Sequence, residues 1–419
     1  MIKSINHLLS DSGKCMKRSA IREILKHLHE PGMISFAGGL PAPETFPVND
    51  LKQIVCEILE KDGPDSLQYG TTEGDPLLRR MLVERHNRQG LKIGIDNLII
   101  TSASQQAIDL LAKVFLNPGD YVLCGLPSYL GGINAFRLYE ARMKGVPLDK
   151  DGMMADKLEE AIIKIRKTGK RIKFIYVIPD FQNPSGITLS EERRLKIIDI
   201  AEKYDLLIVE DSPYREIRFD GKPQKLMNEL DTTGRVITLC TFSKIFAPGF
   251  RVGWIVGHPK ILDKLVMAKQ TADLCTSSFV QKILARYMEK GLLEDNIKRT
   301  IELYRERRNH MIACFMKYMP SGVSWTEPQG GLFLFVTLPP HLNADEIFKK
   351  AIKKNVAFVA GSSFFCNNTG QNTMRINFSF SNKEEIETGV KRLSDVICEE
   401  IEPPAATLPI AIGMSPFPR

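Results

Sequence analysis

The sequence predicts an α/β protein with a large, mostly parallel sheet, followed by a smaller α+β domain. Two patterns indicate this. From Asn97 to about residue 258, short apolar runs alternate with helical segments, which is typical of a parallel sheet covered by helices on both faces. After residue 258 the pattern becomes helical, and short apolar runs return only between residues 332 and 378. The chain therefore predicts two sheets of different kinds.

The segment before Asn97 is predicted to hold helices and a loop. Residues 17–30 carry isoleucines and leucines at helical spacing, and Pro31-Gly32 ends this amphipathic helix. Residues 34–43 predict an extended loop, in which Gly38-Gly39 allows close approach of the backbone. The next two predicted helices are 48–61 and 74–89.

In the α/β part, short apolar runs predict buried strands. The predicted strands are 98–101, 121–124, 174–178, 206–209 and 236–240. The predicted helices between them include 104–115, 190–204 and one after residue 129. The C-terminal part predicts a long helix at 291–318, strands at 332–336, 356–359 and 374–378, and a proline-containing tail at 402–419.

The length of the chain predicts more than one packed unit. At 419 residues and 47.2 kDa it exceeds one ordinary domain. We expect an N-terminal helix and loop, a large domain, a small C-terminal domain and a tail. Their expected ranges are 1–45, 46–290, 291–401 and 402–419.

Composition limits the class of protein. The hydrophobic content of 43% and the charged content of 26% are those of a globular protein. The net charge of +7 comes without a dense basic block, so nucleic-acid binding is not favoured. No window approaches the length of a membrane span, and no signal peptide is evident. The eight scattered cysteines predict no metal site and fit a reducing cytoplasm, where we expect the protein to work.

One segment carries the strongest functional signal. Lys244 follows the apolar run 236–240, and Arg251 comes after a Pro-Gly turn. A lysine held at a strand end in a cleft can lose its proton and form a Schiff base with an aldehyde cofactor. The hydroxyls of Thr241 and Ser243, together with Arg251, suit a phosphate dianion. An exposed Lys-Arg pair is the alternative interpretation.

Polar residues also follow other predicted strands, at the edge where parallel α/β sheets collect ligands. Ser104 and Gln105 open a helix and suit a phosphate, with an ordinary serine cap as the alternative for Ser104. Asn183 lies in an Asn-Pro-Ser-Gly turn, which is also common loop chemistry. Asp211 and Tyr214 follow another strand, and a solvated aspartate is the alternative there.

Together these segments resemble the fold-type I, class I/II aminotransferases that use pyridoxal 5′-phosphate (PLP). The loop 36–41, the Leu67-Gln68-Tyr69 segment and residues 329–333 are most similar to the 2-aminoadipate/kynurenine-type, multisubstrate subgroup. The resemblance covers nearly all of the chain before the tail, and it implies seven strands in the large sheet. The sequence departs from the family at Thr241, where many relatives have serine, and at Ala103, where relatives often have glycine.

The resemblance implies roles around the cofactor. Lys244 would form the Schiff base and, once released, act as the base. Asp211 would keep the pyridinium nitrogen protonated, which makes the ring an electron sink. Tyr214 and Asn183 would donate to the phenolic oxygen. The other implied cofactor contacts are Ser104, Gln105, Thr241, Ser243 and Arg251 at the phosphate, and Tyr129 stacked on the ring.

The resemblance also implies substrate and partner contacts. Arg375 is similar to the arginine that binds the substrate α-carboxylate as a bidentate pair, with Asn183 and Gly39 beside it. Arg22 would pair with the distal carboxylate of glutamate or 2-aminoadipate, with a solvated helical charge as the alternative. Tyr69 lies in a segment that reaches the partner subunit's phosphate site, which implies a homodimer.

The implied activity is transfer of an amino group between an L-amino acid (2-aminoadipate, aromatic or aliphatic) and a 2-oxo acid such as 2-oxoglutarate. A PLP-dependent decarboxylase or lyase is the alternative closest in chemistry. Some bacterial regulators carry the same PLP domain behind a winged-helix unit, but about 16 residues before the first amphipathic helix are too few for one. A nicotinamide dehydrogenase would need a G-x-G-x-x-G after a strand, and the α/β region has none.

Overall fold

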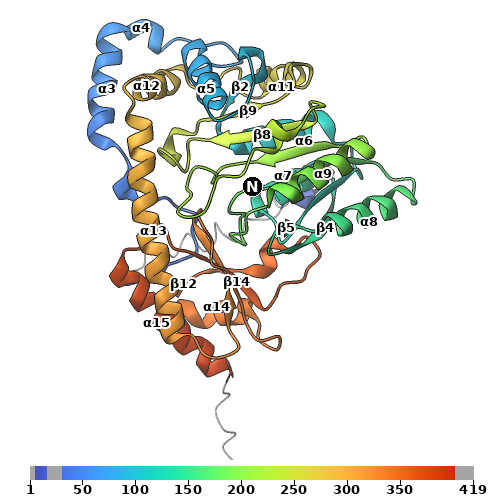
Figure 1. The fold of residues 1–419 in the computed structure, drawn as a ribbon, viewed down its shortest axis with the longest axis vertical. Helices are drawn as coiled ribbons and strands as arrows, with labels where there is room; N and C mark the ends of the chain where they lie inside the picture. Colours follow the sequence, from blue (N-terminus) through green and yellow to red (C-terminus); the bar gives the residue numbers. More distant parts are fainter. Residues whose placement is uncertain (1–4, 17–30, 402–419) are drawn as a thin grey trace, which may run out of the picture.

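The computed structural model describes residues 5–16 and 31–401, and its largest element is a mixed eight-stranded sheet (Figure 1). In sheet order the strands are β2 (Leu98–Thr101), β9 (Gly253–Val256), β8 (Val236–Thr241), β7 (Leu207–Asp211), β6 (Ile172–Val177), β3 (Tyr121–Leu126), β4 (Arg142–Asp149) and β5 (Gly152–Met153). The strands from β8 to β4 run parallel, whereas β9 is antiparallel to both of its neighbours. The mostly parallel sheet is confirmed. Its strands number eight and not the seven implied by the resemblance, because the two-residue β5 extends it at the β4 edge.

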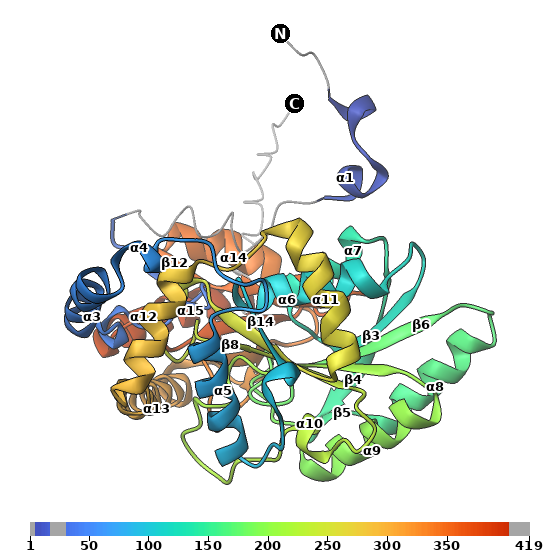
Figure 2. The same cartoon turned by 90° about the horizontal axis from the view of Figure 1, so that it is seen from above.

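Helices cover both faces of this sheet because the side chains of each central strand alternate in direction. In β6, Phe174 and Tyr176 join one apolar core, while Ile175 and Val177 join a second. Helices α6 and α7 pack on the first face, and α8 and α9 on the second (Figure 2). The helices of this part are α3 (Val48–Lys61), α4 (Gly63–Ser66), α5 (Pro76–Arg88), α6 (Ala103–Phe115), α7 (Leu130–Leu138), α8 (Ala155–Arg166), α9 (Glu191–Lys203), α10 (Met227–Leu230), α11 (Pro259–Ala272) and α12 (Ser278–Glu289).

A long helix, α13 (Leu292–Tyr318), leads from this part to a smaller sheet along one side of the molecule (Figure 1). The small sheet is antiparallel in the order β10-β11-β14-β13, and α14 (Ala344–Lys353) and α15 (Lys383–Ile401) pack beside it. Its strands are β10 (Ser324–Trp325), β11 (Phe333–Thr337), β14 (Thr373–Asn377) and β13 (Val359–Ala360). A separate short pair joins β1 (Ile34–Ser35) to β12 (Val356–Ala357), so the N-terminal loop is held by the C-terminal part.

The strands that the sequence pattern did not predict differ from the others in composition or context. β4 carries Arg142, Lys144 and Asp149 and leaves several residues exposed, because only the two-residue β5 lies beyond it. β9 is buried but begins at Gly253, two residues after Arg251, and this short run directly beyond the Pro-Gly turn was not recognised as a strand. β1 lies within the predicted loop 34–43, and Ile34 and Ser35 gain strand pairing only from β12.

Some predictions fall outside what the structure tests. The helix predicted at 17–30 and the tail at 402–419 lie outside the described residues. The domain limits at 45, 290 and 401 stay predictions. In the described part of the chain, no helix combines the length and apolar character needed to cross a membrane. Among the same residues, no group of three or more His, Cys, Asp or Glu side chains could hold a metal ion.

Candidate active site

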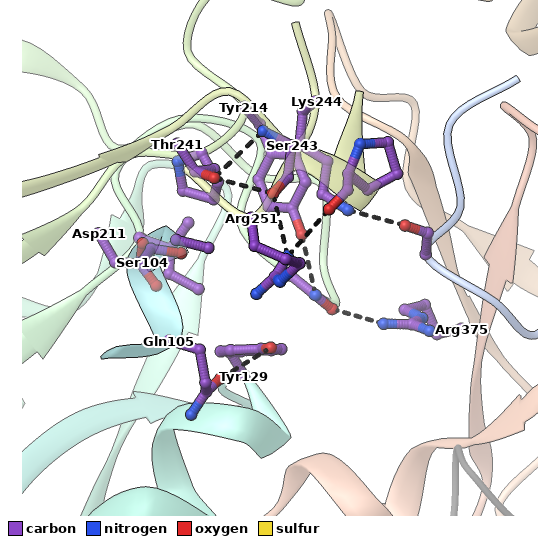
Figure 3. A pocket seen from close by; sticks show the side chains of 16 residues that line it. Ser104, Gln105, Tyr129, Asp211, Tyr214, Thr241, Ser243, Lys244, Arg251 and Arg375 are labelled. Carbon is purple, nitrogen blue, oxygen red and sulfur yellow. Dashed lines mark hydrogen bonds between the residues drawn. The ribbon is translucent and has the colours of Figure 1, made fainter. Parts of the chain in front are cut away.

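The carboxyl ends of the central strands border a cavity of about 360 Å³, at the edge where parallel α/β sheets bind ligands. The cavity lies between the ends of β7 and β8, the start of α6 and the small-sheet strand β14 (Figure 3). Most of the residues predicted from the sequence line it together. They are Gly39, Ser104, Gln105, Tyr129, Asn183, Asp211, Tyr214, Thr241, Ser243, Lys244, Arg251 and Arg375.

Lys244 lies just beyond the end of β8, and its Nζ donates a hydrogen bond to the carbonyl oxygen of Gly39 at 2.8 Å. Burial, followed by the positive charges of Arg375 and Arg251, lowers the pKa of Lys244 to about 8. A neutral amine is therefore far more accessible here than on an exposed lysine. The site provides a nucleophilic nitrogen at near-neutral pH.

Two hydroxyls and a guanidinium lie together in the cavity. Thr241 donates to the Ser243 hydroxyl at 2.9 Å, and Arg251 Nη1 donates to the same hydroxyl at 3.4 Å. Arg251 itself has a left-handed backbone, with φ 52°, which turns the chain out of the short helix before it. Ser104 lies in the first turn of the 13-residue helix α6, whose free N–H groups favour a negative charge.

The turn that precedes Ser104 is strained, and strand β9 packs closely against it. Ala103 has φ 60°, a left-handed conformation in which glycine is unstrained and alanine costs about 1–2 kcal/mol. Behind it, a Cβ on Gly253 of β9 would lie 2.8 Å from the backbone nitrogen of Ser104. Glycine at 253 thus lets β9 approach the turn closely.

Asp211 ends β7 and is buried at 2% exposure. Its Oδ2 accepts a hydrogen bond from the Tyr176 hydroxyl at 2.6 Å, whereas its Oδ1 has no partner among the described residues. Burial raises the pKa of Asp211 to about 7, against the lowering effect of the Tyr176 bond. A buried carboxylate oxygen without a partner is costly, so this side of Asp211 is built to receive a donor or a cation.

A second group of buried polar side chains lies across the cavity. Arg375 donates from Nη1 to Asn183 Oδ1 at 2.9 Å and from Nη2 to the Ala37 carbonyl at 2.6 Å. Asn183 in turn donates to the Tyr214 hydroxyl at 3.1 Å. The Arg375 guanidinium lies 4.2 Å from the ring centre of Phe333, and no carboxylate of the described residues forms a salt bridge with it. Burial lowers the pKa of Arg375 to about 10. A buried cation in this setting favours an anionic ligand.

Comparison with known proteins identifies the family. The model of aminotransferase class I and II matches residues 35–393, which is most of the chain. The chain belongs to the class I and II aminotransferases. This family assignment confirms the resemblance inferred from the strand-end residues.

Individual class I and II aminotransferases are similar over nearly their full lengths. Aromatic-amino-acid aminotransferase 1 of Thermococcus litoralis is 46% identical over 394 residues, covering 94% of both proteins. The solved kynurenine aminotransferase of Pyrococcus horikoshii is 44% identical with a TM-score of 0.92, covering 96% of this chain and 99% of that one. The α-aminoadipate aminotransferase of Thermus thermophilus, solved with N-(5′-phosphopyridoxyl)-L-leucine, is 37% identical with a TM-score of 0.88, covering 95% and 99%. The protein is a PLP-dependent aminotransferase.

The side chains that line the cavity of this aminotransferase match the chemical groups of PLP. The Thr241, Ser243 and Arg251 group suits the phosphate. The unpartnered Oδ1 of Asp211 suits a protonated ring nitrogen. The depressed pKa of Lys244 suits reaction with an aldehyde. The phosphate, the ring nitrogen and the aldehyde of the cofactor therefore each have a matching group in one cavity.

Three predicted residues need separate mention. Tyr129 lines the cavity, and its hydroxyl donates to Gln105 Oε1 at 3.4 Å. Tyr69 does not line it; the side chain is 79% exposed and borders a different cavity with Leu67 and Ser278. Arg22 lies outside the described residues, so its contact with substrate stays a prediction.

The sequence pattern missed several residues at the site. Ile178, Pro213 and Pro248 also line the cavity. Tyr176 binds Asp211 but lies inside an apolar run, where it reads as a core residue of the strand. A signal for it was present, because a tyrosine on a buried strand needs a partner for its hydroxyl.

Proposed function

We propose that the enzyme moves the amino group of an L-amino acid (2-aminoadipate, aromatic or aliphatic) to a 2-oxo acid such as 2-oxoglutarate. The observation that carries this proposal is the placement of Lys244 opposite the buried Arg375 within one cavity. An amino acid bound there by its α-carboxylate would bring its amino nitrogen and Cα toward Lys244. The names of the Thermococcus, Pyrococcus and Thermus relatives support aromatic and 2-aminoadipate substrates.

Each side chain has a defined task in this proposal. When bound, PLP supplies an aldehyde that accepts the amino group and a ring that withdraws electrons from the substrate Cα. Lys244 holds the cofactor and, when free, moves the proton at the substrate Cα. Arg375 and Asn183 bind the α-carboxylate, and Gly39 closes over it. The proposed cofactor contacts are Asp211 at the ring nitrogen, Asn183 and Tyr214 at the phenolic oxygen, Tyr129 on the ring face, and Ser104, Gln105, Thr241, Ser243 and Arg251 at the phosphate.

A substrate panel tests the proposed reaction. The PLP-loaded enzyme is incubated with 2-oxoglutarate and either 2-aminoadipate, phenylalanine or leucine, and all products are quantified. We expect glutamate to form from 2-oxoglutarate in equal amount to the 2-oxo acid of the donor, since an amino group is only moved. Carbon dioxide or ammonia released without glutamate would instead assign the enzyme to the decarboxylases or lyases.

We also propose that the enzyme is a homodimer with shared sites. Leu67, Tyr69 and Leu274 are large apolar or aromatic side chains that are 68%, 79% and 49% exposed, and the first two line one surface cavity. Exposed side chains of this kind, gathered in one region, favour burial against another chain. In the proposed dimer, Tyr69 reaches the phosphate contacts of the partner subunit.

Mixing two inactive variants tests this dimer. Tyr69→Ala and Lys244→Ala homodimers should each be impaired, because every site lacks one of the two side chains. Unfolding and refolding the two together should restore activity, since one site of each mixed dimer then carries both Tyr69 and Lys244. A stable, fully active monomer in sedimentation at assay concentration, or mixing without recovery, would contradict shared sites. The cytoplasmic location stays a prediction.

A further inference from the structure

The carboxylate of Asp211 is held from one side by a tyrosine that the proposed reaction does not use. Tyr176 of β6 lies beside Asp211 of β7, and the two strands are neighbours in the parallel sheet. Its hydroxyl donates to Oδ2 at 2.6 Å, which leaves the unpartnered Oδ1 as the free oxygen of a cavity-lining residue. The hydrogen bond thus selects which carboxylate oxygen is available to a ligand.

The position of Tyr176 is fixed by packing. The side chain is fully buried, and its ring meets the edge of Phe136 with ring centres 5.4 Å apart. A Cβ on Gly132 of α7 would lie 3.0 Å from Tyr176 Cζ and 3.1 Å from its hydroxyl oxygen. Glycine at 132 therefore leaves the space that the phenol occupies. A ring held on these sides directs its hydroxyl at Asp211 without rearrangement when a ligand arrives.

The electrostatic surroundings make this contact important. Burial raises the pKa of Asp211, and the Tyr176 hydrogen bond is the effect that lowers it. Tyr129, Tyr214 and Cys240 also sense the Asp211 charge, but burial raises the pKa of each of these groups, so they remain neutral near pH 7. Tyr176 is therefore the neighbour that favours the ionised carboxylate in the described cavity.

We propose that Tyr176 is a positioning residue that keeps Asp211 ionised and directs its Oδ1 toward the cofactor's ring nitrogen. This role rests on the proposed pairing of Asp211 with that nitrogen. Tyr176 touches neither cofactor nor substrate in this scheme. It acts through Asp211, so its loss should change how the site responds to pH as well as how tightly it holds the cofactor.

Binding of pyridoxamine 5′-phosphate to cofactor-free protein tests the proposal. This amine form cannot react with Lys244, so the titration reports on non-covalent contacts, and it is followed by fluorescence across pH 5.5 to 9 (about two units around neutrality). Tyr176→Phe should weaken binding about 10-fold at pH 7, the scale of one lost hydrogen bond to a charged group. Affinity falls as pH drops through the Asp211 pKa, because the protonated carboxyl no longer pairs with the ring nitrogen. In Tyr176→Phe that fall should begin at higher pH.

Tyr287→Phe is the matched control. Tyr287 is also fully buried, but its hydroxyl has no hydrogen-bond partner among the described residues and it does not line the cavity. Removal of the Tyr287 hydroxyl should leave both the affinity for pyridoxamine 5′-phosphate and its pH profile unchanged. A Tyr176→Phe protein that matches Tyr287→Phe in both measurements would overturn the proposal, because a purely structural tyrosine would behave in this way.

Two further variants keep the outcome decisive. Gly132→Ala would displace the Tyr176 hydroxyl without removing it, and should shift the pH profile in the same direction even if Tyr176→Phe folds poorly. Asp211→Ala is titrated in parallel. Weakened binding in Asp211→Ala with normal binding in Tyr176→Phe would reject only the role of Tyr176. Normal binding in Asp211→Ala would reject the pairing of Asp211 with the ring nitrogen, and the role of Tyr176 with it.

Discussion

Lys244→Ala is expected to abolish transamination while preserving the fold and much of the affinity for PLP. The variant removes the nitrogen that we propose holds the cofactor and moves the proton at the substrate Cα, and the cavity offers no second amine among the residues that line it. The proposed phosphate contacts, Thr241, Ser243 and Arg251, do not depend on Lys244, so they remain. Steady-state assays of the purified variant measure the loss of activity, and fluorescence titration measures the retained cofactor binding.

The pH dependence of cofactor attachment gives an independent test of Lys244. Its pKa is lowered to about 8 by burial, then by Arg375 and Arg251. Only the neutral amine attacks an aldehyde, so the rate of attachment to cofactor-free enzyme should rise with pH and level off above about 8. An unperturbed lysine would keep gaining rate to about pH 10.4. Growth of the visible absorbance band after mixing with PLP follows this rate.

A surface lysine provides the control for both measurements. Lys196 on α9 is largely exposed and pairs with Glu192 one helical turn away. Lys196→Ala should keep the absorbance band, the pH profile of attachment and the turnover rate. Near-wild-type turnover in Lys244→Ala would contradict the proposal that Lys244 holds the cofactor and moves the proton at the substrate Cα.

The sequence alone was sufficient for the strands that contain a mostly apolar run. β8 and β7 are buried along nearly all of their length, and the runs 236–240 and 206–209 predicted them. Because ligands gather where such strands end, the positions of Asp211 and Lys244 in the sequence were enough to place them at the site. β4 was missed because only the two-residue β5 lies beyond it, so most of β4 tolerates charges, and Arg142 and Lys144 interrupt the apolar pattern.

Contacts between distant segments were beyond the sequence pattern. Arg375 and Asn183 are 192 residues apart, and a direct bond between them depends on how the small sheet packs on the large one. The hydrogen bond from Tyr176 to Asp211 depends on the register of β6 and β7. The strain at Ala103 is also tertiary, since Gly253 on another strand backs the turn. Residue types predicted which groups take part, but not which atoms they meet.

Two adjacent carboxylates on β7 lead to the second large effect. Glu210 and Asp211 point to opposite faces of the sheet because side chains alternate along a strand. Glu210 accepts hydrogen bonds from the backbone nitrogen of Met227 and from the Thr238 hydroxyl, both at 2.8 Å. Asp211 lines the cavity with one oxygen unpartnered. The first carboxylate is satisfied within the protein, whereas the second is left incomplete for a ligand.

Asp211→Ala is therefore expected to lower kcat by about 100-fold or more, with a smaller change in KM. In the proposed pairing, loss of the carboxylate removes the negative charge that keeps the ring nitrogen protonated, so less negative charge is withdrawn from the substrate Cα when its proton leaves. Asp211→Asn, which keeps the shape and removes the charge, should resemble Asp211→Ala. Steady-state kinetics with a fixed amino donor, at saturating PLP, measure both parameters.

Glu210→Gln separates this catalytic effect from loss of stability. Glu210 is fully buried and bonds to Met227, Asn228 and Thr238, so its replacement should lower the melting temperature but leave kcat nearly unchanged. Asp211→Asn should show the reverse, because Oδ1 makes no contact among the described residues whose loss would destabilise the fold. A change confined to KM in Asp211→Asn, or equal losses of kcat in the two variants, would mean that Asp211 only shapes the loop that follows β7. Because the two neighbouring side chains point to opposite faces of the sheet, Glu210→Gln should lower the melting temperature, whereas Asp211→Asn should lower kcat.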